Sequence, residues 1–169
     1  MTPADVLDFW FGAPGSGEFG QPRKCWFEKK PAFDEEIRRR FLSALEDAAA
    51  GRLDGWTAQP EGLLALIILL DQFPRNLFRN QPRSFATDSQ ALDLARQAVK
   101  QGLDGRLMPV QRVFAYLPYE HSEDLAMQDR SVTLFAGLAE GREGFGSYLD
   151  YAEKHRAVIR RFGRFPHRN

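Results

Sequence analysis

Cysteine is almost absent from this chain, since Cys25 is the only one among 169 residues. One cysteine excludes a disulfide framework and a cysteine-rich zinc module, and it suits the reducing environment of the cytoplasm. An excess of charge of either sign is also missing, because 23 Lys and Arg balance 23 Asp and Glu. A formal net charge of zero removes the main attraction to nucleic acids and to anionic membrane surfaces. We therefore expect neither as a partner.

Long apolar runs and processing signals are missing as well. The longest apolar run, residues 63–70, is far shorter than a membrane span, and no charged-then-apolar signal peptide opens the chain. Hydrophobic residues nevertheless make up 43% and aromatic residues 12%, which excludes a disordered or fibrous protein. The length is typical of one domain. We expect a single cytoplasmic domain over residues 1–169.

Apolar residues recur at helical spacing along most of the chain. The run at 63–70 also fits a buried strand, but its Leu and Ala content and its length favour a helix buried on all sides. Residues 12–22 hold four Gly and two Pro and predict a loop. The sequence therefore predicts an all-α domain of about seven helices in antiparallel pairs, on the apolar segments 1–11, 33–48, 60–73, 91–99, 109–117, 125–139 and 145–162.

Local signals predict where three of these helices begin or end. Thr87 and Gln90 have the spacing of a capping box. Pro118 is expected to stop the helix before it. Ser122 is expected to cap the next helix, with Glu123 in its first turn complementing the helix dipole.

The first of three polar clusters ends the most hydrophobic segment, at residues 71–76. Pro74 removes a backbone donor and predicts a kink or stop at Phe73. Asp71 and Arg75 are four residues apart and can pair across that turn. One interpretation is a salt bridge that ends the helix. The other is a carboxylate and a guanidinium that line a pocket floor, with Asn76 beside them.

The second cluster, residues 116–130, crowds four carboxylates and a histidine around a helix start. The helix dipole explains Glu123 and Asp124 as ordinary first-turn acids. It does not explain Glu120 and His121, which precede the expected cap and follow an apolar stripe. These two are candidate site residues.

The third cluster, residues 154–169, carries six Lys and Arg and no acid. Within it, His155 is in register with apolar positions and is expected to point inward, either as a hydrogen-bonded core residue or as a site residue. We expect this basic segment to fold back onto the acidic residues 120–129, with Asp71 nearby. Burial of Phe162 and Phe165 would hold it there.

Two other patterns carry less weight. Residues 15–20 match the glycine pattern of dinucleotide-binding loops, but no strand precedes them and Pro22 interrupts the helix that should follow. A metal site is chemically feasible from nitrogen and oxygen ligands, but their spacing is long and irregular, so we assign no metal. Those ligands would be Glu120, His121, His155 and His167.

Long motifs in the chain resemble those of a bacterial family called domain of unknown function 924. They are VLDFWFG at 6–12, WFEK at 26–29, ALIILLDQFPRN at 65–76, HSEDL at 121–125 and RFGRFPHRN at 161–169. The resemblance implies a tetratricopeptide-like helical array, and it implies no particular activity. Similar proteins usually continue past the last motif with a further helical segment. The family's signature positions correspond to Asp71, Gln72, Arg75, Asn76, His121, Ser122, Glu123, Asp124, His155, Arg164, His167 and Arg168.

The leading functional hypothesis is a pocket for a small anionic ligand, with catalysis as an extension. Arginine side chains would clamp a carboxylate or phosphate, and a histidine oriented by a carboxylate would be the acid or base. A helical scaffold for a peptide or protein partner and a purely structural polar network are the alternatives. The ligand-binding candidates are Arg75, Asn76, Arg164, His167 and Arg168. The catalytic candidates are His121, His155, Asp71 and Glu120, and the expected apolar walls are Trp26, Phe73, Tyr119 and Phe165.

Overall fold

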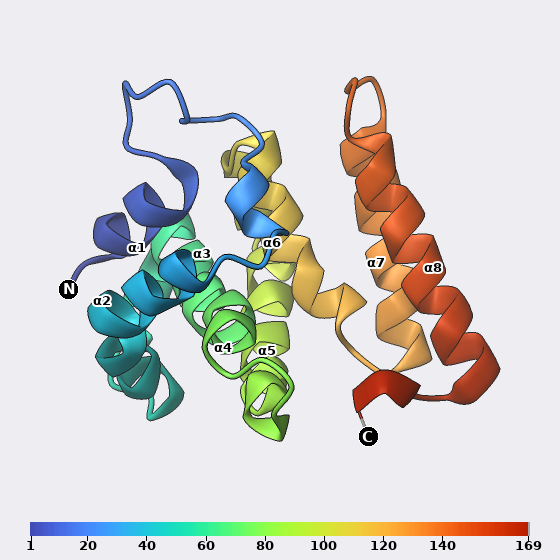
Figure 1. Cartoon of the computed structure of the whole chain (residues 1–169). Helices are drawn as coiled ribbons and strands as arrows, with labels where there is room; N and C mark the ends of the chain where they lie inside the picture. The colour runs from blue at the N-terminus through green and yellow to red at the C-terminus, as the bar shows by residue number, and fades with distance from the viewer. Residues whose placement is uncertain (169) are drawn as a thin grey trace.

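The computed structural model describes residues 1–168, and every regular element among them is helical (Figure 1). The all-α prediction is confirmed. If the continuous helical stretch 60–77 is counted once, these residues hold seven longer helices. They are α1 (Pro3–Phe11), α2 (Pro31–Ala49), α3 (Pro60–Ile67) with η3 (Ile68–Gln72) and α4 (Phe73–Leu77), α5 (Asp88–Lys100), α6 (Pro109–Glu120), α7 (Leu125–Ala139) and α8 (Gly146–Phe162).

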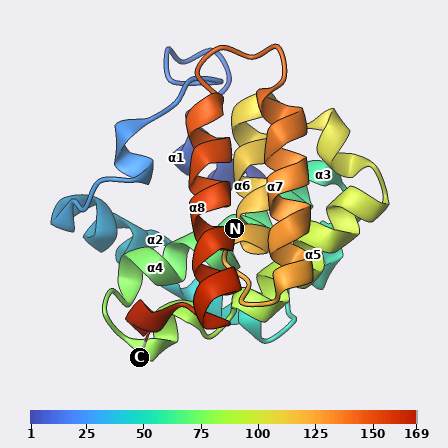
Figure 2. The ribbon, with the colours of Figure 1, turned by 90° about the vertical axis from the view of Figure 1, so that its right-hand side faces the viewer.

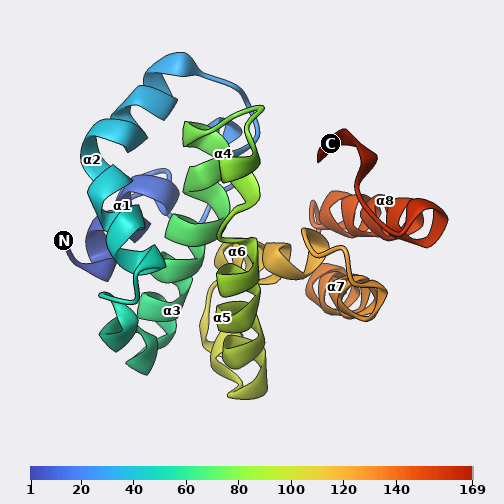
Figure 3. The same cartoon turned by 90° about the horizontal axis from the view of Figure 1, so that it is seen from below.

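The helices are arranged in three groups that follow the chain order. Helices α1–α4 form one side, α5 and α6 lie in the middle, and α7 and α8 form an antiparallel pair on the other side (Figure 1). Figure 2 shows α7 and α8 side by side in front of α6. Seen from below, the C-terminal segment turns back from α8 toward α4 (Figure 3). None of the described helices is long and apolar enough to cross a membrane.

The core forms where α1, α3 and α6 meet, and aromatic rings fill much of it. The rings of Trp26 and Phe114 lie edge to face with their centroids 4.8 Å apart, and Trp10 packs against both. Every residue of α3 except Glu61 is buried, so the prediction of a helix buried on all sides is confirmed. Its Gly62 packs directly against the backbone of the preceding 3₁₀ turn.

Pro74 does not stop the helix at Phe73. Instead, the helix widens into the π-helical turn η3 and continues as α4. A proline cannot donate to the carbonyl four residues earlier, which here is that of Leu70, and its ring crowds that oxygen. The hydroxyl of Thr87 supplies the missing donor, at 2.6 Å from the Leu70 oxygen.

The same contact explains why the predicted capping box at Thr87 and Gln90 is wrong. The Thr87 hydroxyl donates to the Leu70 carbonyl oxygen and makes no capping hydrogen bond to the backbone of α5. The side chain of Gln90 donates instead to the carbonyl of Ala49. Tertiary partners have therefore replaced the local cap that the spacing suggested.

Helix α6 also runs through its proline. Pro118 lies inside the helix, which ends at Glu120 rather than before Pro118. The hydrogen bonds resume after it, since the backbone N–H of His121 donates to the Leu117 carbonyl. Glu120 therefore sits on a helix end rather than in a loop.

The predicted N-cap of α7 is displaced by two residues. The cap is Asp124, whose carboxylate accepts from the Ala126 N–H at 2.8 Å, while the Ser122 hydroxyl accepts from the Asp124 N–H at 3.1 Å. A carboxylate is the stronger acceptor at a helix N-terminus because it also complements the dipole.

The expectation that both C-terminal phenylalanines are buried is half right. Phe165 is 2% exposed, whereas Phe162 is 51% exposed. The chain reverses at Gly163, which adopts a left-handed φ of 70° that suits glycine. The reversal leaves Phe162 on the outer side of α8 and turns Phe165 inward.

Candidate functional site

The site is centred on Asp71, a fully buried carboxylate in the π-helical turn η3. Its Oδ1 lies 2.7 Å from Nδ1 of His121, and its Oδ2 accepts from the side-chain amide of Gln72 at 2.9 Å. Burial alone would raise the pKa of Asp71, but His121 and Arg75 outweigh it and hold that pKa below its usual range. Because the ionised carboxylate can only accept, the proton in this contact is on Nδ1 of His121.

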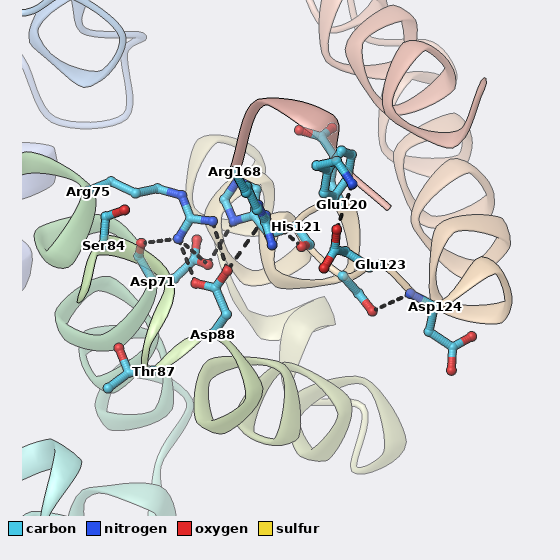
Figure 4. A network of polar contacts seen from close by, with 12 residues as sticks. Asp71, Arg75, Ser84, Thr87, Asp88, Glu120, His121, Glu123, Asp124 and Arg168 are labelled. Atoms are coloured by element: carbon cyan, nitrogen blue, oxygen red, sulfur yellow. Dashed lines mark hydrogen bonds and ion pairs between the residues drawn. The ribbon is translucent and has the colours of Figure 1, made fainter. Parts of the chain in front are cut away.

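Arg75 is held by two carboxylates, one of which the sequence did not reveal. Its guanidinium donates to both oxygens of Asp88, at 2.7 and 2.9 Å, and to the backbone carbonyl of Asp71 at 2.8 Å (Figure 4). The expected Asp71–Arg75 pair is present at 3.5 Å. Asp88 opens α5, so in the sequence it resembles an ordinary dipole-complementing acid.

Glu120, at the end of α6, is a buried carboxyl group with 4% of its surface exposed. It makes no side-chain hydrogen bond to any residue within 1–168, and its Oε2 lies 3.7 Å from Nδ1 of His155. Burial, reinforced by the negative charge of Asp71 and opposed by Arg75, raises the pKa of Glu120 to about 8. At neutral pH the group is a protonated carboxylic acid that can donate a hydrogen bond.

His155 is held as a neutral imidazole. Its Nδ1 lies 2.8 Å from the carbonyl oxygen of Tyr151, which can only accept, so Nδ1 carries the proton. Burial lowers the pKa of His155 below its ordinary value. The ring packs edge to face against Phe165, with the centroids 5.6 Å apart.

A cavity of about 540 Å³ connects these groups. It lies between the η3–α4 turn, the end of α6, and α8. Its polar lining is Gln72, Arg75, Asn76, Arg79, Glu120, His121, Ser147 and His155, and its apolar and aromatic lining is Trp26, Phe27, Leu117, Phe135, Tyr148 and Tyr151. Asp71 lies directly behind His121.

The cavity walls differ from the expected ones. Of the four aromatic residues proposed, Trp26 lines the cavity. Phe73 packs in the core against Trp10, and Tyr119 faces a separate cavity of about 480 Å³. Phe165 supports His155 from outside the lining. The sequence alone did not predict that Tyr148 and Tyr151 of α8 line the cavity. Helical spacing shows which face of a helix is half-buried, but it does not show what that face packs against.

The C-terminal segment folds back onto the acidic residues, as expected. Arg168 donates to the backbone carbonyl of His121 at 2.9 Å and lies 3.7 Å from the Asp88 carboxylate. The backbone N–H of Phe165 donates to Glu123 at 2.5 Å. Glu123 therefore holds the returning C-terminal segment by a hydrogen bond. The sequence alone explained Glu123 only as a complement to the helix dipole.

The remaining basic candidates lie away from the cavity. Arg164 and His167 are exposed and neither lines it. Arg168 packs between the rings of Phe85 and Phe165 and also lies outside the lining. The structure thus brings Arg75 and Arg168 together at Asp88 and does not place Arg164 with them. Residues 1–168 contain no group of three or more His, Cys, Asp or Glu arranged to hold a metal ion.

Comparison with known proteins identifies the family of the chain. The family described as bacterial protein of unknown function (DUF924) matches residues 6–169. This chain is a DUF924 protein. A solved structure of a protein of unknown function from Agrobacterium tumefaciens is 44% identical, with a TM-score of 0.86 over 99% of this chain and 87% of that one. No curated protein matches the chain.

Three of the motifs quoted from the sequence meet around His121. The motif at 65–76 supplies Asp71, Gln72, Arg75 and Asn76, the motif at 121–125 supplies His121, and the motif at 161–169 supplies Arg168. Residues of this DUF924 protein that lie outside those motifs complete the site. They include Asp88, Glu120 and the tyrosines of α8.

Proposed function

We propose that the cavity binds a small anionic molecule that has an apolar body, such as an aromatic or branched carboxylate. The observation that carries this proposal is Glu120, a buried carboxyl group that lines the cavity and has no hydrogen-bond partner within residues 1–168. A buried polar group without a partner is costly, and a bound ligand can supply one. Since this carboxyl group is protonated at neutral pH, the partner it favours is an acceptor such as a carboxylate.

The charges around the cavity also favour an anion. Two arginines line it, against one acid that is uncharged at neutral pH. Arg75 and Arg79 are positioned by Asp88 and Asp34, which orient each guanidinium. A volume of about 540 Å³ with aromatic walls is typical of small-molecule sites.

A thermal-shift experiment tests the binding proposal. We expect benzoate to raise the melting temperature of the protein, and acetate to raise it less because acetate leaves the aromatic walls unfilled. Glu120→Gln should keep the benzoate shift, since the amide still donates, and Glu120→Ala should lose most of it. Glu153→Ala, on the exposed face of α8, is the control.

Two results would contradict the binding proposal. One is that no carboxylate stabilises the protein. The other is that benzoate stabilises Glu120→Ala as much as the unchanged protein. Each variant is compared with its own ligand-free melting temperature, so a change in stability alone does not affect the outcome.

We also propose a cytoplasmic location. The single cysteine, Cys25, is a partly buried free thiol whose pKa is raised by burial, and a chain without disulfides suits a reducing compartment. Fractionation of bacterial cells that express the protein tests this, and recovery from the periplasm would contradict it.

A further inference from the structure

We infer that Glu120 and His121 act as an acid–base pair that moves a proton between a bound 2-oxo acid and its enol form. The inference rests on the proposed function, because it names the class of anion that the cavity would take. Two consecutive residues at the end of α6 both line the cavity, and the structure gives them opposite roles toward a proton.

His121 is built as the base. Its Nδ1 is committed to Asp71 at 2.7 Å, and Asp71 is itself fixed by the side chain of Gln72. The Nε2 atom makes no hydrogen bond to any residue within 1–168, which leaves it to meet a ligand. A buried carboxylate behind a histidine fixes the tautomer with a lone pair on Nε2 and stabilises the imidazolium that forms after proton uptake.

The position of His121 is fixed a second time through its backbone. Arg168 donates to the His121 carbonyl oxygen at 2.9 Å and is held between two aromatic rings. A base that must take a proton from carbon needs such restraint, because small misplacements cost much of the rate. Arg168 and Asp71 are therefore positioning residues, and neither lines the cavity.

Glu120 is built as the acid. It is buried, has no side-chain hydrogen bond to the described residues and is protonated at neutral pH. The charged or titratable groups that face it are Asp71 on η3, Arg75 on α4 and His155 on α8. Asp71 stays ionised while Glu120 stays neutral, and such a split between two nearby carboxyl groups is typical of sites that use both an acid and a base.

A 2-oxo acid matches this pair together with the anion-favouring cavity. In the forward step, Nε2 of His121 takes the proton from the carbon next to the ketone, and the C–H electron pair becomes the C=C bond of the enol. The π electrons of the C=O bond take the proton of Glu120. The products are the enol, a His121 imidazolium and a Glu120 carboxylate, and the reverse step restores all three groups. No oxidant, reductant or further reactant is needed.

Deuterium exchange tests the inference. Phenylpyruvate is incubated with the protein in D₂O, and loss of the C–H signal next to the ketone is followed by NMR against buffer alone. We expect the protein to accelerate exchange, and His121→Gln and Glu120→Gln each to lower that acceleration by about 100-fold or more. Glu153→Gln, an exposed carboxyl on α8, should leave it unchanged. Because Glu120 must hold its proton, the accelerated rate should fall as pH rises past about 8.

Benzoate, which has no exchangeable carbon-bound proton of this kind, separates the two proposals. If benzoate raises the melting temperature but phenylpyruvate exchanges no faster than in buffer, the acid–base inference is wrong and the binding proposal stands. If neither molecule raises the melting temperature, both fail. If Glu120→Gln keeps the benzoate shift and also the full exchange rate, Glu120 is not the acid and the inference fails.

Discussion

Nδ1 of His121 lies 2.7 Å from Oδ1 of Asp71, although the two residues are 50 positions apart in the chain. A proline lies close in the chain to each of the two residues. Pro74 accompanies the π-helical turn that contains Asp71, and Pro118 lies inside the helix whose C-cap is His121. Residues that usually end helices are here placed next to the two groups that meet at the cavity.

Asp71→Asn should destabilise the protein by about 1.5–3 kcal/mol, because the charged hydrogen bond between Asp71 and Nδ1 of His121 is lost, while Arg75 keeps both oxygens of Asp88. His121 and Arg75 would both face a neutral amide. Urea unfolding at neutral pH measures the change. The matched control is Asp47→Asn, which breaks the exposed pair with Arg52 and should cost less than about 1 kcal/mol. A loss that small for Asp71→Asn would contradict the role of Asp71 as a buried charge centre.

Gly62→Ala should also be strongly destabilising, for a steric reason. An added Cβ would lie 1.9 Å from the carbonyl oxygen of Trp56, so the backbone must move. We expect a loss of about 3 kcal/mol or more, at the upper end of overpacking. Gly137→Ala, in α7, meets nothing within 4 Å and should stabilise by about 0.5–1 kcal/mol through helix propensity. Equal effects of the two changes in urea unfolding would disprove the close approach at Gly62.

Much of the helical framework could be predicted because it depends on local chemistry. Apolar spacing located α2 and the buried helix α3, and Pro60 marked where α3 begins. The clusters around Asp71, Glu120 and His121 stood out because they break an apolar pattern for which the helices give no other reason. Their polar groups do line or underlie one cavity.

The rest depends on contacts between distant segments. The spacing of Thr87 suggested a helix cap, but its hydroxyl donates to the carbonyl oxygen of Leu70. That oxygen needs another donor because Pro74, four residues later, has no backbone N–H. Asp88 stands in the first turn of α5, where an acid complements the helix dipole, but its carboxylate binds Arg75. Phe162 shares the helical register of α8 with inward residues, yet at the last position of the helix it is 51% exposed. Periodicity identifies a face, whereas tertiary packing decides what covers it.

Phe165→Ala should cost about 3–5 kcal/mol, since a large, 2% exposed side chain would be removed from beside His155 and Arg168. Phe162→Ala deletes the same side chain three residues earlier, where it is 51% exposed, and should change stability by about 0.5 kcal/mol or less. Urea unfolding of the two variants compares them directly. Similar losses for both would mean that the returning segment is not docked through Phe165.

Glu120→Gln should make the protein more stable at alkaline pH. The pKa of Glu120 rises from 4.5 to about 8 on folding, because burial and Asp71 disfavour its charge more than Arg75 favours it. The folded state therefore binds the proton more tightly, so stability is fully present below about pH 4.5 and is lost as pH rises toward 8. The amide cannot ionise, so at pH 9 the free energy of unfolding of the variant should exceed that of the unchanged protein by on the order of 3–5 kcal/mol, with a much smaller difference at pH 5.

Urea unfolding between pH 5 and pH 9 measures this difference in stability, and the exposed Glu153→Gln is the control. Parallel pH profiles for Glu120→Gln and the unchanged protein would show that Glu120 is ionised in the folded state, and the hydrogen-bond donor assigned to the cavity would then be absent.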